Sequence, residues 1–144
     1  MSALDAAKAI LVADTSLATA ATGGIWTFGD TGRLGLSRTG TPSAFDATGR
    51  IKPCILLKAR SCEPFGGLQD GAYVSTRQML EVWFYDDTGA NLAAMRERVF
   101  ALLHNVQLEG SFLCVWAADV WPGFRDPDLD ASFERSEYAV IGKR

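Results

Sequence analysis

The stretch YVSTRQMLEVWFY, from Tyr73 to Tyr85, decides the fold, because it is the longest β-strand signal in the chain. β-Branched and aromatic residues occur throughout it, as they do in strands that pack on a pleated surface. Both of its faces are apolar near its end, so we expect that end to be covered on both sides. One face carries Val74, Thr76, Leu80, Val82 and Phe84, and the other carries Tyr73, Met79, Trp83 and Tyr85.

An amphipathic helix is predicted to follow this strand, starting at Asp87 or Thr88. Its apolar stripe consists of Leu92, Met95, Val99, Leu102, Leu103 and Val106, and Arg96, Glu97 and Arg98 lie opposite. The segments 112–121 and 133–141 read as two more strands, separated by a turn that contains two prolines and a glycine.

The N-terminal part predicts a further helix and two strands. Ser2 caps the helix, with the Asp5 carboxylate in its first turn. Leu4, Ala7 and Leu11 share one helix face that Ile10 widens, and a short second helical turn extends to Ala21. Strands are predicted over 25–28 and 51–60, with Pro53 at a sheet edge, and a turn over 63–71. The fold class is therefore α+β: a single mixed or antiparallel sheet with two main helices packed on it. Residues 1–144 are predicted to form one domain without an internal repeat.

A long arm, residues 29–50, separates the first two strands. It contains five Gly, four Thr and three Arg among 22 residues, so we expect too little apolar surface for a core of its own. Loops of this length in a compact domain are usually functional or unstructured until a partner binds. The arm is therefore predicted to be flexible and to order on assembly.

Charge is unevenly distributed along the chain. Residues 31–60 hold six basic side chains against one acidic, whereas residues 109–137 hold seven acidic against two basic. This polarity suits head-to-tail contact between identical copies, although two solvated surfaces of opposite sign explain it equally well. The net charge of −3 argues against a dedicated nucleic-acid-binding protein.

The cysteine content and the lengths of the apolar runs narrow the class of protein further. Cys54, Cys62 and Cys114 are an odd number without a CxxC pair, so we expect reduced thiols rather than a disulfide framework. No apolar run approaches the roughly 18–20 residues of a membrane span, and the start does not resemble a signal peptide. We therefore expect no contact with a membrane.

Catalytic and metal signals are weak. His104 is the only histidine, and we expect it to interact with the end of a helix or with solvent rather than to act in a nucleophilic triad. No GK[ST] follows the glycines at 29, 32 and 35, which argues against a phosphate loop. No paired ligand spacing for zinc is present. We predict no cofactor, no metal and no enzymatic activity.

The acidic run Asp126, Asp128 and Asp130, with Glu137 further on, matches several ligand offsets of a calcium-binding EF-hand loop. However, Ala131 stands where that loop needs Gly, and a strand rather than a helix follows. A solvated acidic turn is the better interpretation.

Interface residues are the most specific site prediction. Trp83 and Trp116 lie inside strands and are predicted to be core. Trp26 and Trp121 near strand ends are candidate interface anchors, although burial in the core is the more frequent role of such residues. The arm's arginines could bind carboxylates of a neighbouring subunit or phosphate groups. The alternative is that they only keep the arm soluble. The full predicted interface is Trp26, Arg33, Arg38, Phe45, Arg50, Trp121, Asp126, Asp128 and Asp130.

Short motifs resemble the tail-terminator (tail-completion) proteins of long-tailed bacteriophages. The opening pattern Leu4-x2-Ala7-x2-Ile10-Leu11, Asp14-x2-Leu17-x3-Ala21 and Gly23-Gly24-Ile25-Trp26 is similar to their start. The passage from Arg77 to Asp87, continuing into the helix that ends near Val106, resembles their central strand and second helix. The long arm at 29–50 departs from the family pattern.

The resemblance implies a virion structural protein without catalytic residues. It implies a homo-oligomeric ring, expected to be a hexamer, that caps the tail tube and joins the tail to the head. Its partners would be the tail-tube protein and a head–neck connector, with DNA only passing through the ring. Such a protein is assembled in the host cytoplasm and resides in the tail or neck of the virion.

Three alternatives remain open. A head-completion or adaptor protein of the same neck shares the small size. A small acid–base enzyme is possible with Glu81 as its candidate carboxyl group. A calcium-dependent module would use the acidic run from Asp126 to Glu137.

Overall fold

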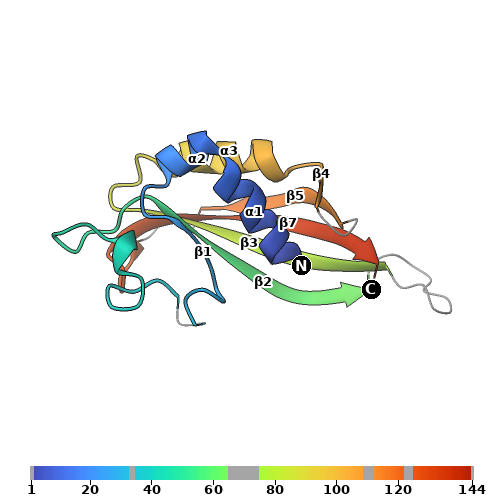
Figure 1. Cartoon of the computed structure of the whole chain (residues 1–144), viewed down its shortest axis with the longest axis horizontal. Helices are drawn as coiled ribbons and strands as arrows, with labels where there is room; N and C mark the ends of the chain where they lie inside the picture. Colours follow the sequence, from blue (N-terminus) through green and yellow to red (C-terminus); the bar gives the residue numbers. More distant parts are fainter. Residues whose placement is uncertain (1, 33–34, 65–74, 109–111, 122–124, 144) are drawn as a thin grey trace.

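The computed structural model describes residues 2–32, 35–64, 75–108, 112–121 and 125–143. It confirms the α+β class: three helices lie on one face of a mixed, mostly antiparallel sheet (Figure 1). The sheet order is β1-β2-β3-β7-β5-β4, with β6 paired to β7. The strands are β1 (Ile25–Thr27), β2 (Cys54–Pro64), β3 (Ser75–Asp86), β4 (Val106–Leu108), β5 (Phe112–Val120), β6 (Arg125–Asp126) and β7 (Ala131–Lys143).

The helices are α1 (Ala3–Ala13), α2 (Thr15–Ala20) and α3 (Leu92–Leu103). The predicted cap of α1 is confirmed, since the Ser2 hydroxyl accepts a hydrogen bond from the Asp5 N–H at 3.1 Å. Asp14 ends α1 and caps α2 by accepting from the Leu17 N–H at 2.8 Å. The apolar stripes of all three helices pack on one sheet face and close an aliphatic core there.

The strand β3 is covered on both sides near its end, as predicted. Phe84 points into the helix-covered core and is 0% exposed, while Tyr85 points to the opposite face and is 5% exposed. The prediction began this strand at Tyr73, and residues 73 and 74 lie outside the described ones.

The arm packs on the face opposite the helices, at the end of the sheet on the left of Figure 1. Leu36, Ala44 and Phe45 are buried against Leu56 and Tyr85 of the sheet. A short 3-10 turn, η1 (Pro42–Ala44), places these side chains. The arm was expected to have too little apolar surface for a core of its own, and in the structure its few anchors pack because the sheet supplies the other side.

Two predicted boundaries of the second main helix are wrong. Asp86 is buried and its carboxylate accepts from the backbone and side-chain N–H groups of Asn91 at 3.0 and 3.2 Å. This turn, which contains Gly89 at φ +85°, occupies the residues predicted to start the helix. At the other end Asn105 adopts φ 58°, which reverses the chain and puts Val106 in β4 instead of the helix.

Strand β2 also extends further than predicted. Glu63 and Pro64 pair with Arg77 and Thr76 of β3, after an irregularity between Ala59 and Cys62. They are therefore strand residues rather than the start of a turn, and residues 65–71 of that predicted turn lie outside the described ones. None of the described helices combines the length and apolar character that crossing a membrane requires.

Candidate functional site

Large apolar side chains are exposed in one small region between α3 and the end of β5. Phe100, Trp116 and Trp121 are 37%, 41% and 60% exposed. These values matter because aromatic residues are normally well buried, and solvent-exposed ones that cluster mark binding surfaces. Phe100 lies on α3, Trp116 on β5 and Trp121 directly after β5.

The local sequence explains why these rings remain uncovered. Arg96 and Phe100 are spaced four residues apart on α3, so they share a face beside the helix's buried stripe. Trp116 points to the helix side of the sheet, opposite the buried Tyr138. Strand β4 pairs with β5 only as far as Cys114, so it does not cover the edge beside Trp116.

Histidine 104 takes the place of a strand partner at this edge. Its Nδ1 atom accepts a hydrogen bond from the Trp116 backbone N–H at 3.0 Å, and its ring stacks on Phe100 at 4.7 Å. His104 is the C-terminal cap residue of α3, as predicted, but it contacts a neighbouring strand and ring rather than only the helix end.

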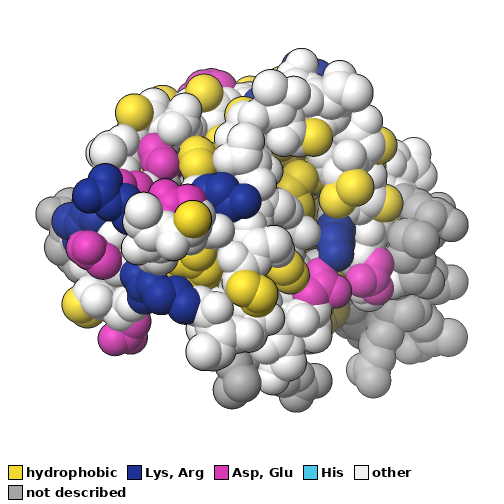
Figure 2. All heavy atoms as spheres, turned by 60° about the vertical axis from the view of Figure 1, so that its left-hand side comes forward, with side chains coloured by type: hydrophobic (Ala, Val, Ile, Leu, Met, Phe, Trp, Pro, Cys, Tyr) yellow, Lys and Arg dark blue, Asp and Glu magenta, His cyan; other side chains and the backbone are white. Residues whose placement is uncertain are grey.

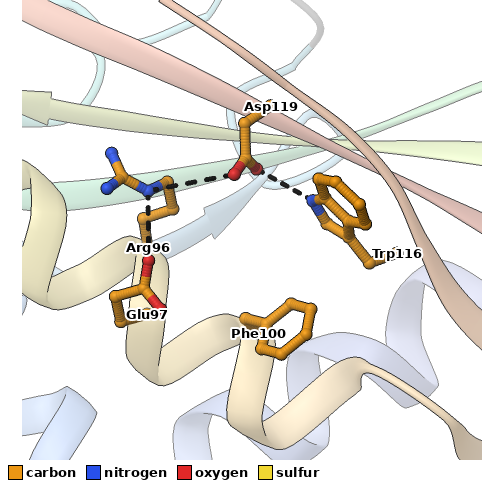
Figure 3. A pocket seen from close by; sticks show the side chains of 5 residues that line it. All are labelled: Arg96, Glu97, Phe100, Trp116 and Asp119. Atoms are coloured by element: carbon orange, nitrogen blue, oxygen red, sulfur yellow. Dashed lines mark hydrogen bonds and ion pairs between the residues drawn. The ribbon is translucent and has the colours of Figure 1, made fainter.

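A pocket of about 240 Å³ opens between these residues, which we call the aromatic pocket (Figure 3). Its lining residues are Arg96, Glu97, Phe100, Trp116 and Asp119. The Phe100 and Trp116 rings meet edge to face, with centroids 6.2 Å apart. The Trp116 indole N–H donates to Asp119 Oδ1 at 3.0 Å, and the Ser136 hydroxyl donates to the same atom at 2.6 Å.

The charges at the aromatic pocket are unbalanced. Arg96 pairs with Glu134, lies 3.6 Å from Glu97 and 4.0 Å from Asp119, and its guanidinium stacks over Trp121 at 5.3 Å. Among the described residues, it is the only cation within 4.0 Å of these three carboxylates. Two negative charges therefore remain uncompensated beside two aromatic faces, an arrangement that attracts a cationic group.

The predicted interface residues are placed elsewhere, with one exception. Trp121 contacts the aromatic pocket through Arg96. Arg33 lies outside the described residues. The other seven predicted residues lie on β1, on the arm, at the end of β6 or on the turn between β6 and β7: Trp26, Arg38, Phe45, Arg50, Asp126, Asp128 and Asp130.

Arg38 fixes the arm to the acidic turn of the same chain. Its guanidinium donates to the carbonyl oxygens of Gly49, Asp128 and Leu129 at 2.9, 3.2 and 3.3 Å. It also lies over the Phe45 ring at 5.0 Å. Phe45 is 7% exposed, so the structure does not offer it as a surface anchor.

Trp26 is half-buried against the core beneath the arm, and its indole N–H donates to the Gly23 carbonyl oxygen at 2.9 Å. Arg50 differs from both Trp26 and Arg38. Its side chain is 72% exposed, and the ion pair that the structure shows for it is with Asp87 at 3.8 Å.

The acidic turn is organised by its own backbone. Asp126 Oδ1 accepts from the N–H groups of Asp128 and Leu129 at 2.9 and 3.0 Å, and Asp130 pairs with Arg125 at 3.3 Å. Among the described residues no group of three potential ligands is placed to hold a metal ion. This geometry agrees with a solvated acidic turn.

The predicted charge polarity is partly neutralised within the molecule. Basic and acidic side chains lie next to one another at the arm end (Figure 2). Arg60 lies 3.6 Å from Glu81 and 3.4 Å from Glu137, since β2 and β7 flank β3. The enzyme alternative relied on Glu81, which is buried, faces Arg60 and accepts from the Trp83 indole at 3.2 Å.

Phe100 and Trp116 were missed by sequence reasoning. Trp116 was predicted to be core because it lies inside a strand, and that prediction is wrong. A usable signal was the spacing of Arg96, Phe100 and His104, which repeats every four residues on the polar side of the predicted helix.

Comparison with known proteins identifies a solved structure with a similar fold. No family model matches the sequence, and no curated protein matches it. Among solved structures the chain is similar to a chain from the virion of a native gene transfer agent particle. The TM-score is 0.60 at 12% identity, and the match covers 98% of this chain and 92% of that chain. At this identity the likeness establishes a shared fold over essentially the whole chain.

Proposed function

We propose that this protein is a structural subunit of a phage-like virion, and specifically a tail terminator that assembles as a homo-oligomeric ring. The observation that carries the proposal is the fold shared, along 98% of the chain, with a component of a virion particle. In this proposal the ring caps the tail tube and joins the tail to the head, and the protein acts by assembly without a catalytic step.

Two features of the surface support an assembling subunit. The first is the aromatic pocket, where the exposed rings of Phe100, Trp116 and Trp121 resemble the anchors that dominate protein interfaces. The second is the outer edge of β2. Pairing with β1 ends at Leu57, whereas β2 continues to Pro64, so part of this edge has no strand partner in the described part of the chain. Unpaired edges of this kind are templates for association.

Growth of tail tubes in the presence of the protein tests the specific role. Tail-tube protein is polymerised with and without an excess of the purified chain, and tube lengths are measured by electron microscopy. A terminator stops elongation and appears as extra density at one tube end. Tubes of unchanged length with bare ends would argue against the terminator role, and binding only to a head–neck connector would indicate a neck adaptor instead.

A further inference from the structure

The aromatic pocket has the chemistry of a receptor for a basic side chain. Two aromatic faces, Phe100 and Trp116, stand at an interplanar angle of 78°, and Glu97 and Asp119 line the same cavity (Figure 3). Aromatic faces attract cations through the negative charge of their π-systems, and carboxylates add directly to that attraction. The Glu97 side chain is 71% exposed, so its charge is available to a guest.

The pocket also contains an unsatisfied donor. Arg96 Nε is buried and makes no hydrogen bond, since the carboxylate oxygens of Glu97 and Asp119 lie 3.6 and 4.0 Å from it, beyond hydrogen-bond distance. Buried donors without an acceptor are uncommon in folded proteins, and each one calls for a specific explanation. A polypeptide segment that enters the pocket brings backbone carbonyl oxygens that can accept from this atom.

We propose that the aromatic pocket binds the Arg50 side chain of a second copy of this chain. Two other described cations of the basic segment are engaged within their own copy. Arg38 donates to three carbonyl oxygens, and Lys58 lies 4.5 Å from the Trp83 ring centroid. Among the described residues of the arm, Arg50, at 72% exposure and with one ion pair at 3.8 Å, is the cation that the structure leaves available.

The arm presents Arg50 in a defined position. Asp46 Oδ1 accepts from the N–H groups of Thr48 and Arg50 at 2.8 and 3.0 Å, and the Asp46 N–H donates to the Arg50 carbonyl oxygen at 2.8 Å. This closed turn restricts the backbone at Arg50, so less conformational entropy is lost on binding.

A second copy must supply the guest because the sheet separates the two partners. Arg50 belongs to the arm, which packs on one face of the sheet. The pocket is formed by α3 and β5 on the opposite face. A contact between different surfaces of identical subunits is heterologous, and heterologous contacts close into rings when the rotation allows it. The inference thus rests on the proposed ring assembly and names the contact that builds it.

A charge exchange between the two partners tests this contact. Wild type, Arg50→Glu, Glu97→Lys, Trp116→Ala and the double variant R50E/E97K are compared by sedimentation velocity over a range of concentrations. Each single variant should weaken self-association by about tenfold or more, since Glu97→Lys removes the close charge pair, Trp116→Ala removes the cation–π contact and Arg50→Glu removes both. The double variant should associate more tightly than either charge-reversed single variant, because the charge pair is restored with reversed sign, but it should stay weaker than wild type because a carboxylate guest makes no cation–π contact.

The matched control is R50E combined with Asp128→Lys, which reverses an exposed carboxylate on the acidic turn outside the pocket. This control should remain as weak as R50E alone, and circular dichroism should show every variant folded. Self-association of Trp116→Ala at the wild-type level, or equal recovery with the Asp128→Lys control, would overturn the inference while leaving the proposed function intact. A wild type that stays monomeric at every concentration would overturn the proposed function and the inference together.

Discussion

The two faces of the sheet are covered in different ways. On one face, α1, α2 and α3 bury a continuous aliphatic core, with Leu57, Val82 and Phe84 of the sheet 0% exposed beneath them. On the other face the arm covers one end with a smaller core. There the rings of Trp83, Tyr85 and Phe133 stack with centroids 5.7 to 6.4 Å apart.

The difference follows from the number of apolar side chains that the helices and the arm each contribute to the core beneath them. An amphipathic helix brings an apolar residue every three or four positions, whereas the arm brings isolated anchors, chiefly Leu36, Ala44 and Phe45. Segments with few buried apolar contacts open locally at a lower free-energy cost than the core elements. We therefore expect the helix face to carry the stability of the fold and the arm face to open first.

The largest expected effect comes from shortening a buried ring on each face. Phe84→Ala should lower the free energy of unfolding by about 3–5 kcal/mol, because it leaves a cavity between fixed helices and the sheet. Phe45→Ala should cost less than about half as much, since the arm can move into the space. Urea unfolding of both variants measures this ratio. Equal losses of unfolding free energy in the two variants would mean that the arm and the helices are equally rigid.

Cysteine reactivity measures the opening of each cover directly. Burial raises the pKa of both Cys54, beneath the arm, and Cys114, beneath the helices, to about 12, with the Asp86 charge adding to the effect at Cys54. Their chemical reactivity is therefore similar, and a difference in rate reports opening. Exposed Cys62 should react with a thiol reagent first, and Cys54 about tenfold or more faster than Cys114.

Two outcomes of this labelling would break the comparison. A Cys54 as slow as Cys114 would show an arm as firmly packed as the helices, against the predicted flexibility. A Cys54 as fast as Cys62 would show that the packed arm seen in the structure is not maintained in solution.

A smaller effect is expected at the link between the arm and the acidic turn. Arg38→Ala removes the hydrogen bonds to three carbonyl oxygens and should cost about 1 kcal/mol, because the side chain is largely exposed. It should also raise the labelling rate of Cys54 without changing that of Cys114. Measured at concentrations where the protein is monomeric, Arg50→Ala is the matched control on the same arm and should leave both the stability and the labelling rates near those of wild type.

The smallest effect concerns acid stability of the helix layer. A hydrogen bond from Arg98, together with one from the Leu17 backbone, lowers the pKa of Asp14 from 3.8 to about 2. A carboxyl group with a lowered pKa in the folded state stabilises the protein above its unfolded pKa and loses this effect as the pH falls. The melting-temperature advantage of wild type over Asp14→Asn should therefore hold at pH 6 and shrink between pH 3.8 and about 2. A constant difference across this range would contradict the assigned role of Asp14.

Local patterns in the sequence predicted the parts of the fold that depend on neighbours along the chain. The Ser2 cap, the short second helical segment before Ala21 and the two faces of β3 each follow from spacing and side-chain chemistry within a few residues. The start of α3 was missed because a buried carboxylate, Asp86, holds the preceding turn through hydrogen bonds to Asn91. Nothing in the local sequence shows that Asp86 is buried.

The candidate site was less predictable because it depends on the strand order and on the residue at which each strand pairing ends. Trp116 is exposed because β4 ends its pairing at Cys114, and strand order cannot be read from the residues around the tryptophan. Phe45 was among the predicted interface residues, and the structure buries it on the far face of the sheet, which the sequence around it does not show. Trp121 was named a candidate interface anchor although burial in the core was the more frequent expectation, and the structure shows it 60% exposed.

Electron microscopy of the purified wild-type protein, combined with its mass in solution, tests the central claim most directly. The account predicts closed rings of identical subunits with a central opening, at a mass that is a whole multiple of one 15.6 kDa chain. Monomers alone, over the full concentration range and in the presence of purified tail tubes, would contradict it.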